Sequence, residues 1–358
     1  MTAPVLDTRS LNRATLHRQF LLERVDRPIE EVVGRLVGMQ AQNPLDPYFG
    51  LWARMVHFDS SALAAMTQNR EMVRGQFMRG TVHLFGAADG LAIHPVTADV
   101  LRRVFGSTQF AKDLAGIDME RLLTAARRLM EESPRTRAEL GRELASIWPG
   151  YPPGSLGQAA TYLIPVVQIP PRGVWGQKGQ ATWAPLETFL AGHHGPEIPV
   201  EDLVIRYLGG FGPAAVKDMR VWSGLTGLSE VFERLRPRLR VYRDENGAEL
   251  FDLADIEHPD PDTPAPPRLL PEYDNVLLGH HDRSRFFDGD AIPKGWVGNV
   301  LVDGMFAGSW KRAGSVIELE LTRHGWTDDE GVTAEAVRLG GLAWPGEVEE
   351  IRVQGFDH

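Results

Sequence analysis

Apolar residues in the first part of the chain recur at the three- and four-residue spacing of α-helices. Pro28 fits the first turn of the second predicted helix, where a missing backbone N–H costs nothing. Two strand-like segments then lie on either side of Arg79-Gly80. The pattern predicts helices over 11–24, from Pro28 onward, over 48–55 and from a cap at Asp59 or Ser60 to Met66, followed by strands over 70–78 and 81–85.

The same order of elements recurs twice, although no exact sequence repeat is visible. Asn246-Gly247 is a strong signal for the turn of the last hairpin. Three helices followed by a β-hairpin is the order of a winged helix, so the chain is predicted to hold three of them in tandem. The recurring segments are helices 119–130, 137–147 and 156–163 with strands 166–169 and 182–184, then helices 200–208, 214–221 and 228–235 with strands 241–244 and 249–252.

Beyond a proline-rich linker at 258–268 the pattern becomes mainly β. Strict alternation from Ile317 to Leu321 predicts a strand with one wet face, and Asp303-Gly304 predicts a hairpin turn. Short, evenly spaced strands favour a small barrel. The predicted strands are 275–278, 296–302, 305–310 and 316–321, with a helix at 332–340.

The predicted fold class is therefore α+β, with three tandem winged-helix domains followed by a C-terminal β-barrel. The length of 358 residues agrees with two to four units. The predicted domains are winged helices at 10–115, 116–197 and 198–257 and the barrel at 258–358.

Composition narrows the function classes. The sequence has no apolar run of 18 residues and no apolar signal core at its start. A membrane span and secretion are therefore not expected, and we expect a cytoplasmic location. The absence of cysteine excludes disulfides, thiolate catalysis and cysteine-ligated zinc. A net charge of −10 argues against nonspecific nucleic-acid binding by the whole surface, but leaves room for a local basic face.

The candidate chemistry lies in Gln40-Ala41-Gln42, at the junction between two predicted helices. Glutamine is a poor acid and a poor base, so a reaction that uses this pair must already have a good leaving group. On spacing alone, the two amides are more simply explained as caps of the helix end and the turn.

A series of short motifs in one order carries a family resemblance. With these motifs the chain resembles the winged-helix DNA glycosylases of the azinomycin-resistance, AlkZ-like, type over roughly residues 10–350. The resemblance implies tandem winged helices with a C-terminal barrel, excision of alkylated purines, and a catalytic Gln-x-Gln motif at Gln40 and Gln42. The motifs are QAQ at 40–42, PYFGLWAR at 47–54, RGTVHL at 79–84, PPRGVW at 170–175, GPA at 212–214, WSGL at 222–225, PEYDNVLLGH at 271–280 and VDG at 302–304.

Amide chemistry fits this expectation. A purine alkylated at N7 or N3 is positively charged and leaves as a neutral base, so a strong general acid gains little. What remains is to position a water molecule and to stabilise a sugar that resembles an oxocarbenium ion. A glutamine carbonyl can accept a hydrogen bond from water, and its dipole can face a cation. Undamaged purines need protonation to leave, so such a site would discriminate against them.

Six residues are candidates for contact with DNA, each with a structural alternative. The arginines would contact phosphates or be solvated or ion-paired, and His83 is more simply a core histidine. Asp274 and Asp282 are expected to be partners of Arg283 and Arg285. The His-His pairs lack metal-ligand spacing, so no metal and no organic cofactor is expected. The candidates are Arg54, Arg74, Arg79, His83, Arg172 and Arg283.

The sequence thus predicts a monomeric, monofunctional DNA glycosylase acting on bulky N7- or N3-alkylpurines in double-stranded DNA, including interstrand cross-links, for repair or self-resistance. The wings and a hairpin near 286–296 or at Asp303-Gly304 would grip the duplex. Two alternatives stay open, a non-catalytic winged-helix regulator and a protein that sequesters the free toxin. A bulky lesion favours attack without full flipping of the base.

Overall fold

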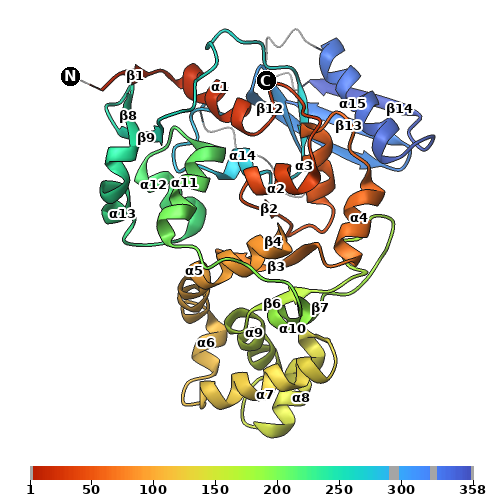
Figure 1. Ribbon diagram of the computed structural model, residues 1–358. Coiled ribbons are helices and arrows are strands. Elements are labelled where there is room, and N and C mark those ends of the chain that lie inside the picture. The colour runs from red at the N-terminus through yellow and green to blue at the C-terminus, as the bar shows by residue number, and fades with distance from the viewer. Residues whose placement is uncertain (1–2, 290–297, 323–328, 356–358) are drawn as a thin grey trace.

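The computed structural model describes residues 3–289, 298–322 and 329–355 and shows a mixed α+β fold (Figure 1). Within these residues the strands form three sheets. Helices α6 to α9 form one end of an elongated molecule, and both termini lie at the other end. No helix in the described part of the chain is both long and apolar enough to cross a membrane.

The first third contains the predicted helices and hairpin. Asp59 caps α4, because its carboxylate accepts a hydrogen bond from the backbone N–H of Ser61 at 2.8 Å. The hairpin turn at Arg79-Gly80 has positive φ at both residues, as a two-residue turn requires. The elements are β1 (Val5–Leu6), α1 (Thr8–Arg18), α2 (Ile29–Arg35), β2 (Met39–Gln40), α3 (Asp46–Arg54), α4 (Ser60–Gln68), β3 (Met72–Met78), β4 (Thr81–Gly86), α5 (Ala87–Gly106) and α6 (Gln109–Asp113).

The next two units repeat the order of three helices and a hairpin. Thr136 and Glu139 form a reciprocal capping box at the start of α8. That each unit is a winged-helix domain with the stated limits stays a prediction. The elements are α7 (Met119–Glu132), β5 (Arg135–Thr136), α8 (Arg137–Ile147), α9 (Pro153–Leu163), β6 (Val166–Gln168), β7 (Thr182–Pro185) and α10 (Leu186–Phe189), then α11 (Val200–Phe211), α12 (Val216–Ser223), α13 (Leu228–Leu235), η1 (Arg236–Arg238), β8 (Leu239–Asp244) and β9 (Glu249–Leu253).

The first two hairpins join into one sheet of six strands in the order β2-β4-β3-β6-β7-β5. The junction is the antiparallel pairing of β3 with β6, in which Gly75 lies opposite Val167. A Cβ atom at position 75 would lie 2.7 Å from the Val166 carbonyl oxygen, so the close approach of the two strands requires glycine. Strand β2 forms the outer edge of this sheet and carries Gln40.

The C-terminal part is an open sheet, so the predicted barrel is wrong for the described residues. Five strands run in the order β10-β11-β12-β13-β14, and β10 and β14 remain as edges. Helix α15 packs on this sheet against β10 and β14. The elements are β10 (Arg268–Leu270), α14 (Asn275–Leu278), β11 (Gly298–Val302), β12 (Met305–Ala313), β13 (Val316–Leu321), α15 (Asp329–Ala343) and β14 (Glu350–Gly355).

Residues 275–278 form the short helix α14, not the predicted strand. The carboxylate of Asp274 accepts the backbone N–H of Val276 at 3.0 Å and so caps the helix. The predicted alternation from Ile317 to Leu321 is confirmed, since Ile317, Leu319 and Leu321 are buried, whereas Glu318 and Glu320 are partly exposed.

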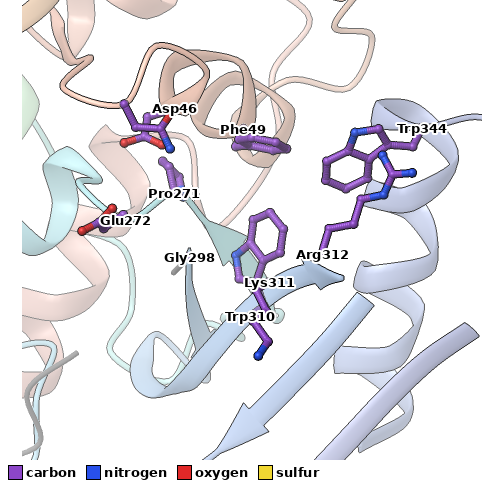
Figure 2. Close-up of a pocket in the computed structure, with 10 residues that line it drawn as sticks. Asp46, Phe49, Pro271, Glu272, Gly298, Trp310, Lys311, Arg312 and Trp344 are labelled. Carbon is purple, nitrogen blue, oxygen red and sulfur yellow. The ribbon is translucent and has the colours of Figure 1, made fainter. Parts of the chain in front are cut away.

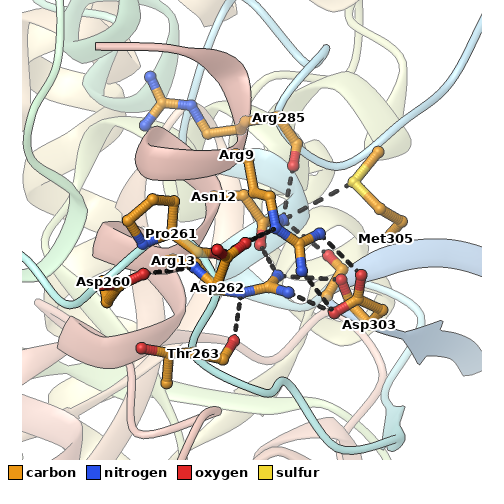
Figure 3. A network of polar contacts seen from close by, with 11 residues as sticks. Arg9, Asn12, Arg13, Asp260, Pro261, Asp262, Thr263, Arg285, Asp303 and Met305 are labelled. Carbon is orange, nitrogen blue, oxygen red and sulfur yellow. Dashed lines mark hydrogen bonds and ion pairs between the residues drawn. The ribbon is translucent and has the colours of Figure 1, made fainter.

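The Asp303-Gly304 turn is tied to α1 by hydrogen bonds and ion pairs (Figure 3). Arg13 forms an ion pair with the Asp303 carboxylate, and Arg9 pairs with it at 2.8 Å. The Asn12 side chain donates to the Gly304 carbonyl at 2.8 Å. A DNA grip at this turn stays a prediction, and the alternative at 286–296 lies mostly outside the described residues.

Candidate active site

The glutamine pair lies at the edge of the six-stranded sheet, after a sharp reversal of the chain. Helix α2 ends at Arg35, and Val37 and Gly38 then both adopt left-handed φ angles, of 52° and 80°. A Cβ atom at position 38 would lie 2.4 Å from the Phe85 ring, so glycine is required there. A β-branched residue such as Val37 rarely adopts positive φ, so the reversal stores backbone strain next to the motif.

Backbone pairing fixes the motif in this position. Gln40 lies opposite His83 in the antiparallel pairing of β2 with β4, and the Ala41 N–H donates to the Val82 carbonyl at 2.8 Å. The Ala41 carbonyl accepts a hydrogen bond from Arg74 at 2.8 Å. The peptide between the two glutamines is therefore bonded on both sides. The prediction that the pair caps a helix end is not what the structure shows.

Both glutamine side-chain oxygens are held by donors from the β3–β4 hairpin. Arg79 donates to Gln40 Oε1 at 3.0 Å, and the Val82 N–H donates to Gln42 Oε1 at 3.2 Å. Gln40 is 8% exposed, whereas Gln42 is exposed. A carbonyl oxygen has two lone pairs, so each amide keeps an acceptor position after this contact.

Arg79 connects the motif to the third unit. Its guanidinium donates to the Trp222 carbonyl of α12 as well as to Gln40. Burial lowers the pKa of Arg79 to about 10, so the group is still protonated at neutral pH. A fixed cation beside Gln40 polarises its amide and holds it in one orientation.

Asn275 was not predicted as a site residue, although it lies within one of the motifs that carry the resemblance. Its Oδ1 accepts the backbone N–H of Gln40 at 3.2 Å. Its Nδ2 donates to the carbonyls of Leu36 and Gly38, at 3.1 and 2.6 Å. One side chain from α14 thus holds the strained reversal and the catalytic candidate together. No local signal in the sequence shows this contact across more than 230 positions.

The predicted DNA-contact residues fall into three groups by burial. Arg54 and Arg74 are 0% and 2% exposed, and His83 is 2% exposed. Burial also lowers the pKa of His83 to about 3, and the ring donates from Nδ1 to the Thr81 carbonyl at 3.0 Å. These three side chains are almost completely buried in this conformation, and their contact with DNA stays an untested prediction.

Arg79 and Arg172 are partly buried, and Arg283 is exposed. Arg172 donates to the Gly179 carbonyl at 3.2 Å, and Arg283 stacks on Phe287 with its guanidinium carbon 4.4 Å from the ring centroid. Contact of these three with DNA remains a proposal. Asp274 was expected to be a partner of Arg283 or Arg285. It pairs with Arg54 instead, so this prediction is wrong.

Asp46 was also not singled out from the sequence. It is the first residue of α3, 2% exposed, and its Oδ2 has no hydrogen-bond partner. Burial, with Glu272 and Asp274 nearby, raises the pKa of Asp46 to about 8, while the Tyr273 N–H and Arg74 act in the opposite direction. An acid in the first turn of a helix is ordinary, so the sequence gives no sign that this carboxyl is protonated at neutral pH.

This raised pKa has a consequence for stability. Because the folded protein holds a proton that the unfolded chain loses near pH 4, stability falls as the pH rises from about 4 to about 8. Asp46→Asn removes this dependence. We expect the free energy of unfolding of the variant, relative to that of the wild type, to rise by at most ~1.4 kcal/mol per pH unit within this window. Above the window this difference should stay constant. Urea unfolding of both proteins across the window measures the difference; a constant difference would contradict the assignment.

The described residues include no group of three or more His, Asp or Glu side chains placed to bind a metal ion. The site itself combines two amides, a guanidinium and a buried carboxyl. Such a set can hold a water molecule and face a cation, which is what an N-glycosyl hydrolase for a charged base needs.

Comparison with known proteins identifies the family. The family model "DNA glycosylase AlkZ-like" matches residues 33–342, and the chain belongs to this family of DNA glycosylases. The sequence is 24% identical over 367 residues to the interstrand DNA cross-link repair glycosylase of Streptomyces sahachiroi, covering 90% of this chain and 91% of that one. The fold is similar to that of the Streptomyces sahachiroi DNA glycosylase AlkZ, with a TM-score of 0.74 and 20% identity over 98% of this chain and 100% of that one. The family and enzyme class predicted from the motifs are confirmed.

Proposed function

We propose that this enzyme hydrolyses the N-glycosidic bond of bulky N7- or N3-alkylated purines in duplex DNA, without lyase activity. The observation that carries the proposal is the fixed pair of amide oxygens at one sheet edge, Gln40 held by Arg79 and Gln42 held by the Val82 N–H. The biological role is repair of, or self-resistance to, a DNA-alkylating natural product, including its interstrand cross-links. The name of the Streptomyces sahachiroi relative supports the last point.

The amides act on water and on the sugar. A free lone pair on Gln40 or Gln42 accepts a hydrogen bond from the attacking water and orients it toward the anomeric carbon. The amide dipoles face the positive charge that develops on the sugar as the bond breaks. The purine carries away the bonding electrons and becomes neutral, so the amides need not donate a proton to it. Arg79 keeps Gln40 in place and is a positioning residue.

To test the proposal, the enzyme is incubated with a duplex that contains one bulky N7-alkylguanine. Wild-type enzyme is expected to produce abasic sites that mild alkali cleaves at the lesion, and none in the undamaged duplex. Breaks without alkali would contradict the absence of lyase activity. If abasic sites do not exceed those in the enzyme-free control, the proposed function fails.

The same purified protein can be used to test the two alternative functions, a non-catalytic regulator and a protein that sequesters the toxin. A regulator would bind one undamaged sequence in preference to others and leave the lesion intact. A sequestering protein would bind the free alkylating compound more tightly than adducted DNA. Binding titrations with unmodified duplexes and with the free compound measure both, and the proposed function requires that adducted duplex is bound best.

A further inference from the structure

A cleft of about 250 Å³ lies between the start of α3 and strand β12 (Figure 2). Asn43, the residue after Gln42, lines it, as do Pro271 and Glu272, which belong to the same segment as Asn275. The cleft is therefore bounded by the two segments that carry and hold the glutamines. Its size suits one purine ring, so the bulky substituent of a lesion would have to extend out of the cleft.

Aromatic side chains form one wall of the cleft. Phe49 lies in the middle, with its ring centroid 5.4 Å from Trp310 and 5.6 Å from Trp344. Trp310 is fixed, since its indole N–H donates to the Leu270 carbonyl at 2.8 Å. These rings come from α3, β12 and the end of α15, and they present an apolar surface on which a flat heterocycle can stack.

Carboxyl groups lie at one end of the cleft. Asp46 and Glu272 both line it, and Asp46 has a buried Oδ2 without a hydrogen-bond partner. A buried unpartnered acceptor costs free energy unless a ligand satisfies it. In the free protein the cost is reduced because Asp46 is protonated near neutral pH. A cation that enters would favour its ionised form.

A basic side chain lies at the other end (Figure 2). Arg312 lines the cleft there and stacks on Trp344 with its guanidinium carbon 4.6 Å from the ring centroid, whereas Lys311 directs its amine toward Glu318 on the opposite face of the sheet. Their acidic partners are Glu318, at 3.1 Å from Lys311, and Glu347, at 2.7 Å from Arg312. The cleft therefore has an acidic end and a basic end across an aromatic wall.

We propose that this cleft binds the lesion nucleotide, with its positively charged alkylpurine stacked on the aromatic wall at the acidic end and its phosphate at the basic end. The proposal rests on the proposed function and names the group that confers selectivity for damaged bases. An N7-alkylpurine nucleotide carries both charges, a positive ring and a negative phosphate. An undamaged nucleotide carries only the phosphate and lacks the charge that Asp46 and Glu272 would attract.

The experiment measures binding without turnover, by calorimetry on the full chain. The probes are 7-methylguanosine 5′-monophosphate, with its positive imidazolium ring, and guanosine 5′-monophosphate. Wild-type protein is expected to bind the methylated nucleotide ~10-fold more tightly. In Asp46→Asn this preference is expected to disappear, while Trp344→Leu should weaken both nucleotides by ~10-fold.

Two further variants keep the test decisive. Asp202→Asn makes the same chemical change at an exposed residue in the first turn of α11 and should leave both affinities unchanged. Arg312→Gln, at the guanidinium that lines the cleft, should remove the advantage of 7-methylguanosine 5′-monophosphate over 7-methylguanosine. Circular dichroism confirms that each variant is folded.

The outcomes separate this inference from the proposed function. Equal affinity of the wild type for both nucleotides, or an unchanged preference in Asp46→Asn, overturns the inference. If the enzyme still excises the lesion from the duplex in that case, the proposed function stands alone. If the preference is present but no abasic sites form, the cleft is a nucleotide site and the proposed function fails.

Discussion

Gln40→Ala and Gln42→Ala are each expected to lower the rate of abasic-site formation by ~10²–10³-fold, the range found when one preorganised polar group is removed from an active site. Each change removes an amide oxygen that is already fixed, by Arg79 in one case and by the Val82 N–H in the other. Single-turnover kinetics on the duplex with one N7-alkylguanine measure the loss directly, because product release does not enter.

In the proposed mechanism the two glutamines act on one water molecule, so their effects on the rate are expected not to add. The double variant should be little slower than either single variant. Gln109→Ala, at an exposed residue of α6, is the matched control and should keep the wild-type rate. A variant of Gln40 or Gln42 that is folded and as fast as the wild type would remove the pair from the mechanism.

Arg54→Met is expected to reduce the free energy of unfolding by ~3–5 kcal/mol. Arg54 and Asp274 are 0% and 2% exposed and form a bidentate pair, with N–O distances of 2.8 and 2.6 Å. Removing the guanidinium leaves a buried carboxylate without its counter-charge, which costs far more than the pair itself gains. Urea unfolding followed by tryptophan fluorescence gives the change in midpoint and slope.

Two comparisons test the cause of this destabilisation. Arg54→Met combined with Asp274→Asn removes both charges and keeps a residue that can cap α14, so we expect it to be more stable than Arg54→Met alone. Arg102→Ala breaks an exposed ion pair with Asp99 and should cost no more than about 1 kcal/mol. If Arg54→Met costs as little as Arg102→Ala, the buried pair does not hold this part of the protein together.

Local signals in the sequence predicted many elements well. Helices 137–147 and 228–235 have the predicted limits, in the first case because Thr136 and Glu139 form a capping box that reads directly from the residues. The 20-residue helix α5 was not predicted, and it contains Pro95, which in a sequence argues against a helix interior. The open C-terminal sheet was mistaken for a barrel because β14 joins β13 through a parallel pairing across an intervening helix. Strand spacing does not report such a pairing.

The candidate site divides in the same way. Gln40, Gln42 and Arg79 lie within short motifs, and the structure brings Arg79 and Gln40 into contact. Asn275 and Asp46 matter through contacts with residues more than 200 positions away, which no periodicity encodes. Burial also cannot be read from residue type. Arg54 and Arg74 are arginines, as phosphate contacts often are, but they lie inside the protein.

The strained reversal before Gln40 depends on a side chain from the far end of the chain, so the catalytic apparatus is not a separable module. A fragment that ends before residue 258 would keep both glutamines and lose Asn275, the residue that ties Leu36, Gly38 and Gln40 together. Such a fragment can be mixed with its complementary C-terminal fragment, and excision assayed before and after mixing. The assay would show whether the two fragments together have an activity that neither has alone. In this chain, an exchange of the first segment would therefore have to include the segment that carries Asn275.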